Sequence, residues 1–160
     1  MNSKGLTLIE LMVVLAIIAM LATFALTGYH ATTQKVKVES EIKALYGNLQ
    51  NARMRAFAEK RVWGVCWSGS SFTSYSLGYD NNGDGSIDNY TGTVSDLAYP
   101  VKVNSNSTTC AKFNPSGWAR SLTTFHIEGV DDAEYDCVSV SKTRIKMGKW
   151  DESSSECVKR

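Results

Sequence analysis

The feature that most constrains this 160-residue chain is an apolar run near its start, at residues 6–26. The run contains three polar residues, Thr7, Glu10 and Thr23. As a helix, a run of this length spans roughly 30 Å, which is the hydrocarbon thickness of a bilayer. The run therefore predicts a membrane-spanning helix. An ionised Glu in hydrocarbon costs on the order of several kcal/mol unless a cation pairs with it, so the sequence also predicts a partner for Glu10.

A small residue, Gly5, precedes this apolar run. Secretory signal peptides have a shorter apolar core, and their small-residue cleavage site follows that core. The order seen here is the reverse, which argues against an ordinary secretory signal. A plain single-span anchor that tolerates Glu10 is the alternative to a processed segment.

Residues 4–10, KGLTLIE, followed by the apolar run, resemble the class III signal of type IV prepilins and type II secretion pseudopilins. The resemblance implies that a prepilin peptidase cleaves after Gly5 and that the new amine of Leu6 is methylated. It implies that Glu10 neutralises the N-terminal amine of a neighbouring subunit. It further implies a single-pass inner-membrane protein with an exported C-terminal domain, which an inner-membrane assembly platform builds into a periplasmic or extracellular filament of sister subunits.

The helical pattern continues beyond the apolar run. An apolar stripe recurs at spacings of three and four residues, which is typical of one helix face, and consists of Val38, Ile42, Leu45, Leu49, Ala52 and Ala56. The sequence therefore predicts one helix from residue 6 to about residue 60. We expect four segments: a leader at 1–5, a transmembrane or filament-core helix at 6–27, an amphipathic half of the same helix at 28–60, and a β-sheet domain at 61–160.

After residue 60 the apolar period becomes that of strands. Aromatic and β-branched runs at 62–67 and 72–79, joined by a Gly/Ser turn at 68–71, predict a hairpin. Further strands are predicted at 98–103, 122–127, 137–141 and 144–147. The expected fold class is α+β, with the long N-terminal helix packed on an antiparallel β-sheet. The family resemblance identifies this arrangement with the type IV pilin fold.

The cysteines Cys66, Cys110, Cys137 and Cys157 are even in number and contain no C-x-x-C spacing. This pattern predicts two disulfides in an oxidising compartment. Of the three connectivities, we favour Cys66 with Cys110 and Cys137 with Cys157, because the second pair would close a C-terminal loop. Free thiols or a metal site are the alternative.

Two stretches of the predicted sheet domain resemble known globular domains. The segment CAKFNPSGWAR at 110–120 and CVSVS at 137–141 look like the H-type pseudopilin and fimbrial T-type minor pilin group. A main filament subunit, a minor pilin at the tip that primes assembly or captures DNA, and a type II secretion pseudopilin all stay open.

One loop carries oxygen-bearing side chains at alternate positions, as in the first half of a calcium-binding loop. These are Asp80, Asn82, Asp84, Ser86 and Asp88. Position 12 of such a loop is normally a bidentate Glu, but here it is Thr91. Calcium is therefore the one cofactor that the sequence suggests. The alternative is a simple hairpin loop, because Asn-Gly and Asp-Gly pairs are strong turn formers.

Four cations near the C-terminus, followed by an aromatic residue, suggest a DNA-binding face. They are Lys142, Arg144, Lys146 and Lys149, and alternation along a strand would place them on one face. The fimbrial T-type group has a Gly-Arg-x-Arg element at the corresponding place, where this chain has TRIK at 143–146. A solvated strand face is the alternative, and the net charge of +1 predicts no general affinity for polyanions.

No pattern typical of an enzyme is present in the sequence. His30 and His126 are too few and too isolated for a metal site or a catalytic triad, and there is no Gly-rich phosphate loop or H-E-x-x-H motif. The sequence therefore predicts no enzyme, and the family resemblance implies a structural filament subunit.

Overall fold

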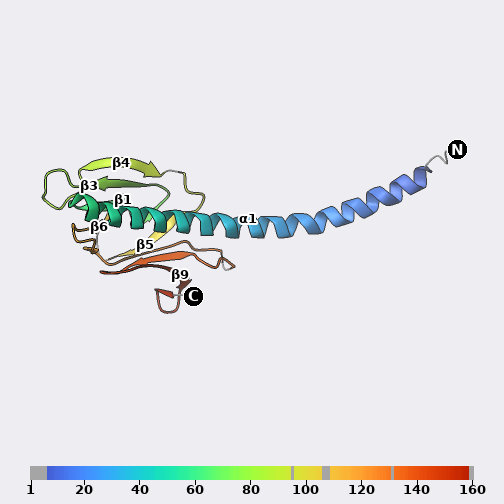
Figure 1. The fold of residues 1–160 in the computed structure, drawn as a ribbon. Helices are drawn as coiled ribbons and strands as arrows, with labels where there is room; N and C mark the ends of the chain where they lie inside the picture. The colour runs from blue at the N-terminus through green and yellow to red at the C-terminus, as the bar shows by residue number, and fades with distance from the viewer. Residues whose placement is uncertain (1–6, 95, 106–108, 131, 159–160) are drawn as a thin grey trace. The chain divides into compact units, whose positions relative to one another are not determined.

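The computed structural model describes residues 7–94, 96–105, 109–130 and 132–158, with the side chains of 22–31 left undescribed. The chain divides into two compact units, Met1–Gln34 and Lys35–Arg160. A single helix, α1 (Leu8–Glu59), provides the described part of the first unit and begins the second (Figure 1).

Local features of the chain define where α1 begins and where it ends. At the start, the backbone N–H of Glu10 donates to the Thr7 hydroxyl oxygen at 3.3 Å, which satisfies a donor that the helix itself leaves unpaired. Thr7 and Glu10 also have the spacing of a capping box. At the other end, Lys60 adopts a left-handed backbone with φ of 54° directly after Glu59, as is usual for the residue that ends a helix.

The described side chains of the first unit nearly all belong to α1. From residue 8 to residue 21 they are exposed on every side, although all of them except Glu10 are apolar. In the part of the chain that the structure describes, no helix has an apolar stretch of the length that crossing a membrane requires.

In the second unit, α1 buries one face. Every member of the predicted apolar stripe is at most 1% exposed, which confirms the helical spacing seen in the sequence. The stripe packs into a core with Trp63, Tyr75, Phe113 and Phe125, which are also almost fully buried.

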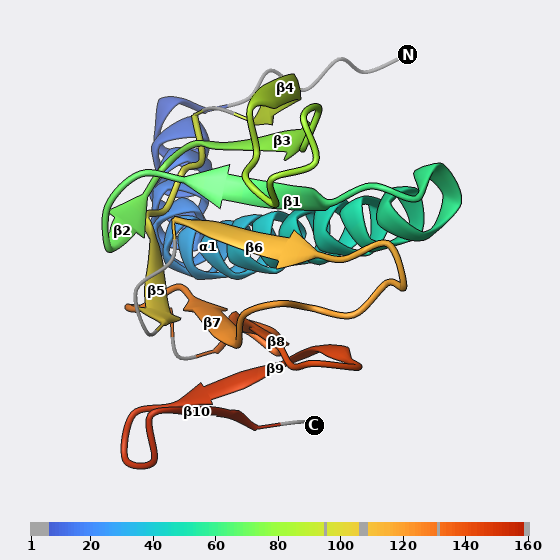
Figure 2. The same cartoon turned by 90° about the vertical axis from the view of Figure 1, so that its left-hand side faces the viewer.

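Two antiparallel sheets contribute to this core, and Figures 1 and 2 show them on different sides of α1. The first has the order β4 (Asn89–Val94), β3 (Tyr75–Tyr79), β1 (Trp63–Trp67), β6 (Cys110–Phe113). The second has the order β10 (Glu156–Val158), β9 (Ile145–Asp151), β8 (Cys137–Val140), β7 (Thr123–His126), β5 (Val101–Ser105), β2 (Ser71–Phe72).

The α+β class is confirmed, but the single sheet expected from the sequence is two sheets. The predicted strand at 72–79 is interrupted: Phe72 belongs to β2, which pairs with β5, whereas Tyr75 begins β3, which pairs with β1. Phe72 and Tyr75 are both buried, and the exposed residues between them let the chain pass from one sheet to the other. The unpredicted strands are short or lack alternation; β4, for example, is exposed along almost its whole length.

Each sheet contains one disulfide. Cys66 bonds to Cys110, and these residues face each other across β1 and β6. Cys137 bonds to Cys157, which joins β8 to β10 on either side of β9. These are the two pairs that the sequence favours.

Candidate functional site

The predicted processing residues Gly5 and Leu6 lie outside the described residues. Cleavage after Gly5 and methylation of Leu6 therefore stay predictions.

Glu10 lies in the first turn of α1, where a carboxylate interacts favourably with the positive end of the helix dipole. Its side chain is exposed, and among the described residues no cation pairs with it. The partner expected from the sequence is therefore not supplied by the part of the chain that the structure describes.

The residues around Glu10 form an apolar surface that runs all the way around α1. Their side chains are between 49% and 78% exposed, and they are Leu8, Ile9, Leu11, Met12, Val13, Val14, Leu15, Ile17, Ile18, Met20 and Leu21. A helix that is apolar on all sides is stable only when lipid or other protein covers it. This surface and Glu10 together are the candidate assembly site.

The predicted calcium loop connects β3 to β4 and closes on itself. Asp80 is 5% exposed, and one carboxylate oxygen accepts the N–H groups of Asn82 and Gly83 at 3.1 and 2.6 Å. The other accepts the N–H of Gly85 at 2.6 Å. Asp84 accepts the N–H of Ser86, which is the main reason its pKa lies below the usual value. The exposed Asp88 accepts the N–H of Asn81 at 2.8 Å.

Cations from the neighbouring β6 region hold the same loop. The Lys112 ammonium donates to the carbonyl oxygen of Gly85 at 3.0 Å, and Arg120 donates to it at 3.4 Å. Within the described ranges, no three His, Cys, Asp or Glu side chains are grouped so that they could hold a metal ion. Calcium binding at this loop stays a prediction.

The four cations near the C-terminus do not form the single row that we expected. Successive residues of a strand point to opposite faces, so the odd-numbered Lys149 does not share a face with the other three, which are even-numbered. The Lys149 ammonium pairs with the buried Asp136 at 2.7 Å. The Lys142 ammonium lies 5.4 Å from the centre of the Trp118 ring, before β9 begins. The structure therefore separates Lys149 and Lys142 from Arg144 and Lys146.

Arg144 and Lys146 instead line a hollow of about 450 Å³ together with Arg53 of α1. The sequence did not single out Arg53, because it lies about ninety positions earlier in the chain, and α1 and β9 come together only in the folded domain. The one sequence feature that points to Arg53 is that it directly follows Ala52, a member of the buried stripe, and so lies beside the helix face that packs on the sheets.

Two family models match the chain. One, described as a prokaryotic N-terminal methylation motif, matches residues 1–26. The other, described as type II transport protein GspH, matches residues 41–143, which is more than half of the chain. No curated protein matches the sequence.

Two solved proteins share the fold. The type IV minor pilin FimU of Pseudomonas aeruginosa strain PAO1 is 20% identical, with a TM-score of 0.58 over 79% of this chain and 96% of that chain. The minor pseudopilin EpsH from the type 2 secretion system of Vibrio cholerae is 8% identical, with a TM-score of 0.51 over 70% of this chain and 95% of that chain. The match over more than half of the chain shows that the chain belongs to the GspH family of type II transport proteins, and the two solved proteins show that its fold is that of a type IV minor pilin and a minor pseudopilin.

Proposed function

We propose that this chain enters its filament through the N-terminal half of α1, by exchanging lipid for the helices of neighbouring subunits. The observation that carries the proposal is the apolar surface at residues 8–21, which is exposed on all sides and contains one carboxylate, Glu10. The hydrophobic effect is roughly proportional to the apolar area removed from water, and it has no preferred direction. The same surface can therefore be covered first by lipid and then by protein.

Glu10 gives this apolar interface its specificity. A buried carboxylate without a partner is strongly destabilising, at about 3 to 5 kcal/mol when one member of a buried pair is lost. Cleavage after Gly5 would create a free amine on Leu6, and methylation leaves such an amine able to carry a positive charge. The amine of a neighbouring subunit is then the partner that Glu10 requires.

The remaining steps follow from the prepilin-type signal at residues 1–26. The chain is held in the inner membrane as a single-pass protein, with its C-terminal domain exported. A prepilin peptidase removes the leader, and the inner-membrane assembly platform transfers the subunit into a periplasmic or extracellular filament. Its role is structural and involves no catalysis.

The test compares three variants of the full chain in cells that assemble the filament. Gly5→Ala is expected to retain the leader, which mass spectrometry detects, and to be missing from the sheared filament fraction. Glu10→Ala is expected to be cleaved normally but to be missing from the same fraction. Glu152→Ala, which removes an exposed carboxylate in a distant turn, should be incorporated like the wild type. Normal incorporation of both Gly5→Ala and Glu10→Ala would overturn the proposal.

A second candidate function is that of a minor subunit, present in few copies and needed to start assembly. It is favoured by the GspH match and by the shared fold with FimU and EpsH, which are named as a minor pilin and a minor pseudopilin. Quantitative mass spectrometry of sheared filaments distinguishes the two roles. A minor subunit is a small fraction of the filament protein, whereas a main subunit dominates it. Loss of protein export on deletion, with surface pili unaffected, would identify a pseudopilin.

A further inference from the structure

Two hollows meet on one side of the globular unit, and we call them together the α1–β9 groove. Gln50 and Arg53 of α1 line both hollows. The first, of about 450 Å³, is completed by Arg144 and Lys146 at the start of β9. The second, of about 500 Å³, continues along α1 past Phe57. The two hollows thus adjoin at Gln50 and Arg53 on α1.

The first part of the groove is positively charged. Arg53, Arg144 and Lys146 all line it, and no acidic residue does. In the described part of the chain, none of these three side chains has an ion pair or a hydrogen bond. Like charges that share a hollow repel each other, so an anion placed there would gain from all three. Two arginines also offer the forked donors that bind a carboxylate with two parallel hydrogen bonds.

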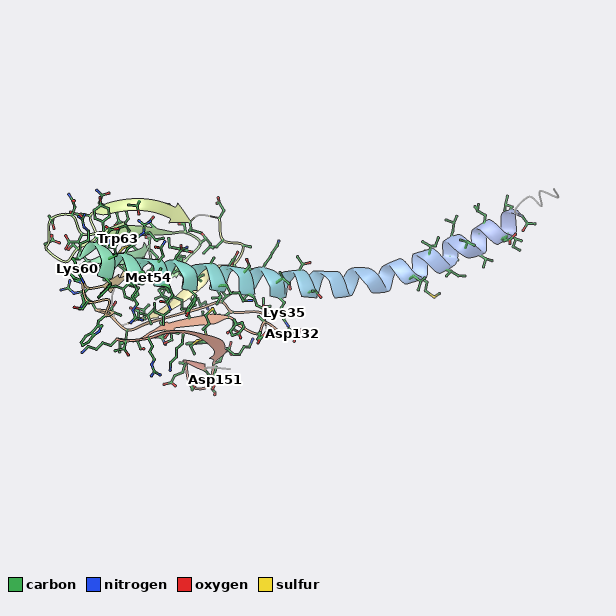
Figure 3. All side chains as sticks on the ribbon, viewed as in Figure 1. Lys35, Met54, Lys60, Trp63, Asp132 and Asp151 are labelled. Atoms are coloured by element: carbon green, nitrogen blue, oxygen red, sulfur yellow. A yellow bond between two sulfur atoms is a disulfide. The ribbon has the colours of Figure 1, made fainter. Side chains whose placement is uncertain are left out.

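The second part of the groove is apolar. Met54 is 66% exposed and Phe57 is 58% exposed, and both follow Arg53 on α1. Figure 3 shows Met54 on the last turns of the helix, near Lys60. Large exposed apolar side chains that lie together mark a surface where another molecule binds. The two parts together match a ligand that is anionic at one end and apolar at the other.

Aromatic rings beside the groove are not open platforms for nucleic-acid bases. The Lys43 ammonium lies 5.6 Å from the centre of the Tyr135 ring, and the Lys60 ammonium lies 3.9 Å from that of Phe57. Single-stranded nucleic acids bind largely by stacking their bases on such rings. A lysine over one face of each ring leaves only the other face for a base, so stacking gains less here than on an open ring, whereas a peptide does not depend on stacking.

We propose that the α1–β9 groove binds an acidic peptide segment of another protein, with the carboxylates at Arg53, Arg144 and Lys146 and an adjacent apolar side chain against Met54 and Phe57. The groove lies wholly within the globular unit. Its binding can therefore be measured whether or not the chain assembles through α1 as proposed above.

The probe is a short fluorescein-labelled peptide in which Glu residues flank a single Phe, and the readout is fluorescence anisotropy with the full chain in detergent micelles. We expect Arg53→Gln and Arg144→Gln each to weaken binding at least about fivefold, since each removes charge-assisted hydrogen bonds. Lys37→Gln, which removes an exposed lysine elsewhere on α1, is the matched control and should leave the affinity unchanged.

A second comparison isolates the apolar part. Met54→Ser should weaken binding of the Phe-containing peptide by a few fold but have no effect on a peptide with Ala in place of Phe. Near-ultraviolet circular dichroism establishes that each variant is folded.

Three results would overturn the proposal. The first is equal binding of a peptide with Gln in place of Glu, and the second is an affinity unaffected by either arginine substitution. The third is tighter binding of a single-stranded oligothymidylate of the same length, with the same loss in the arginine variants, which would show a nucleic-acid surface instead.

Discussion

Residues 8–21 and 38–56 belong to the same helix and are both rich in apolar side chains, yet their exposure differs. In the first stretch the apolar side chains surround the helix and are about half exposed or more, whereas in the second a single stripe is at most 1% exposed. The second stretch is stabilised by the sheets of its own chain. The first has no such cover among the described residues, so its stability depends on what surrounds the molecule.

The carboxylates on the two stretches differ in the same way. Glu39 accepts the N–H of Glu134 at 3.0 Å and pairs with Lys43 at 3.3 Å. Glu41 accepts the N–H of Ala98 at 2.6 Å. These two residues tie the β7–β8 loop and the connection between β4 and β5 to α1, whereas the Glu10 carboxylate has no such bond within the described chain. One end of the helix therefore serves folding, whereas the other is the surface that we propose for assembly.

The largest expected effect is a loss of stability when the buried stripe is cut back. Leu49 is fully buried, so Leu49→Ala should lower the free energy of unfolding by about 4 kcal/mol, through lost burial and the cavity left behind. Leu15→Ala, the same change on the exposed stretch, should leave it unchanged. Chemical denaturation in detergent, followed by tryptophan fluorescence, measures both. An equal loss of unfolding free energy in the two variants would contradict the difference in burial between the two stretches.

The next effect concerns the disulfide between Cys137 and Cys157. These residues are 20 positions apart, and a loop of that length restricts the unfolded chain by about 3 kcal/mol. The double variant Cys137→Ser, Cys157→Ser should lose about that much stability in the same denaturation experiment. An unchanged midpoint would contradict a contribution from this bond to the globular unit.

A smaller effect is expected for Glu39. The N–H of Glu134 is the main reason that the pKa of Glu39 lies below its ordinary value of 4.5. A carboxyl with a lowered pKa stabilises the fold above its unfolded pKa, and that stability is lost as the pH falls through the folded pKa. Stability should thus decline below about pH 4.5, and Glu39→Gln should cost about 1 kcal/mol at neutral pH and make this decline shallower. Thermal melts over a pH series test this, and identical profiles would contradict it.

The smallest expected effect is that of calcium on the loop at 80–88. With calcium at about three times its dissociation constant, a site in the folded state would add about 0.8 kcal/mol. Thermal shift at millimolar calcium should therefore show a rise in melting temperature that EDTA reverses. The rise should be absent in Asp84→Asn, which removes a charge from the loop. No shift in the wild type would contradict calcium binding there.

Much of the helix could be predicted from the sequence, because a period of three and four residues has one structural solution over so long a stretch. The sheets were harder. Phe72 and Tyr75 suit a single strand by composition, but they belong to different sheets, because Phe72 pairs with β5 and Tyr75 pairs with β1. A short or exposed strand such as β4 has no alternation to detect.

The candidate functional residues divide in the same way, into those that the sequence predicts and those that it does not. Glu10 stood out because a charge within an apolar run needs a local explanation. Lys149 was placed wrongly because its partner, Asp136, lies directly before another strand, β8. Arg53 was missed because the groove that it lines is made by elements far apart in the chain.

The most direct test of the central claim, that residues 8–21 are an assembly surface with Glu10 as its one polar contact, is the amount of Glu10→Gln in sheared filaments. Gln keeps the size of the side chain but loses its charge, so only the pairing with an amine is removed. The account predicts at least about a tenfold fall relative to Glu152→Gln, since even 1.4 kcal/mol of lost pairing is tenfold in an equilibrium constant. Equal amounts of the two variants in the filament fraction would contradict it.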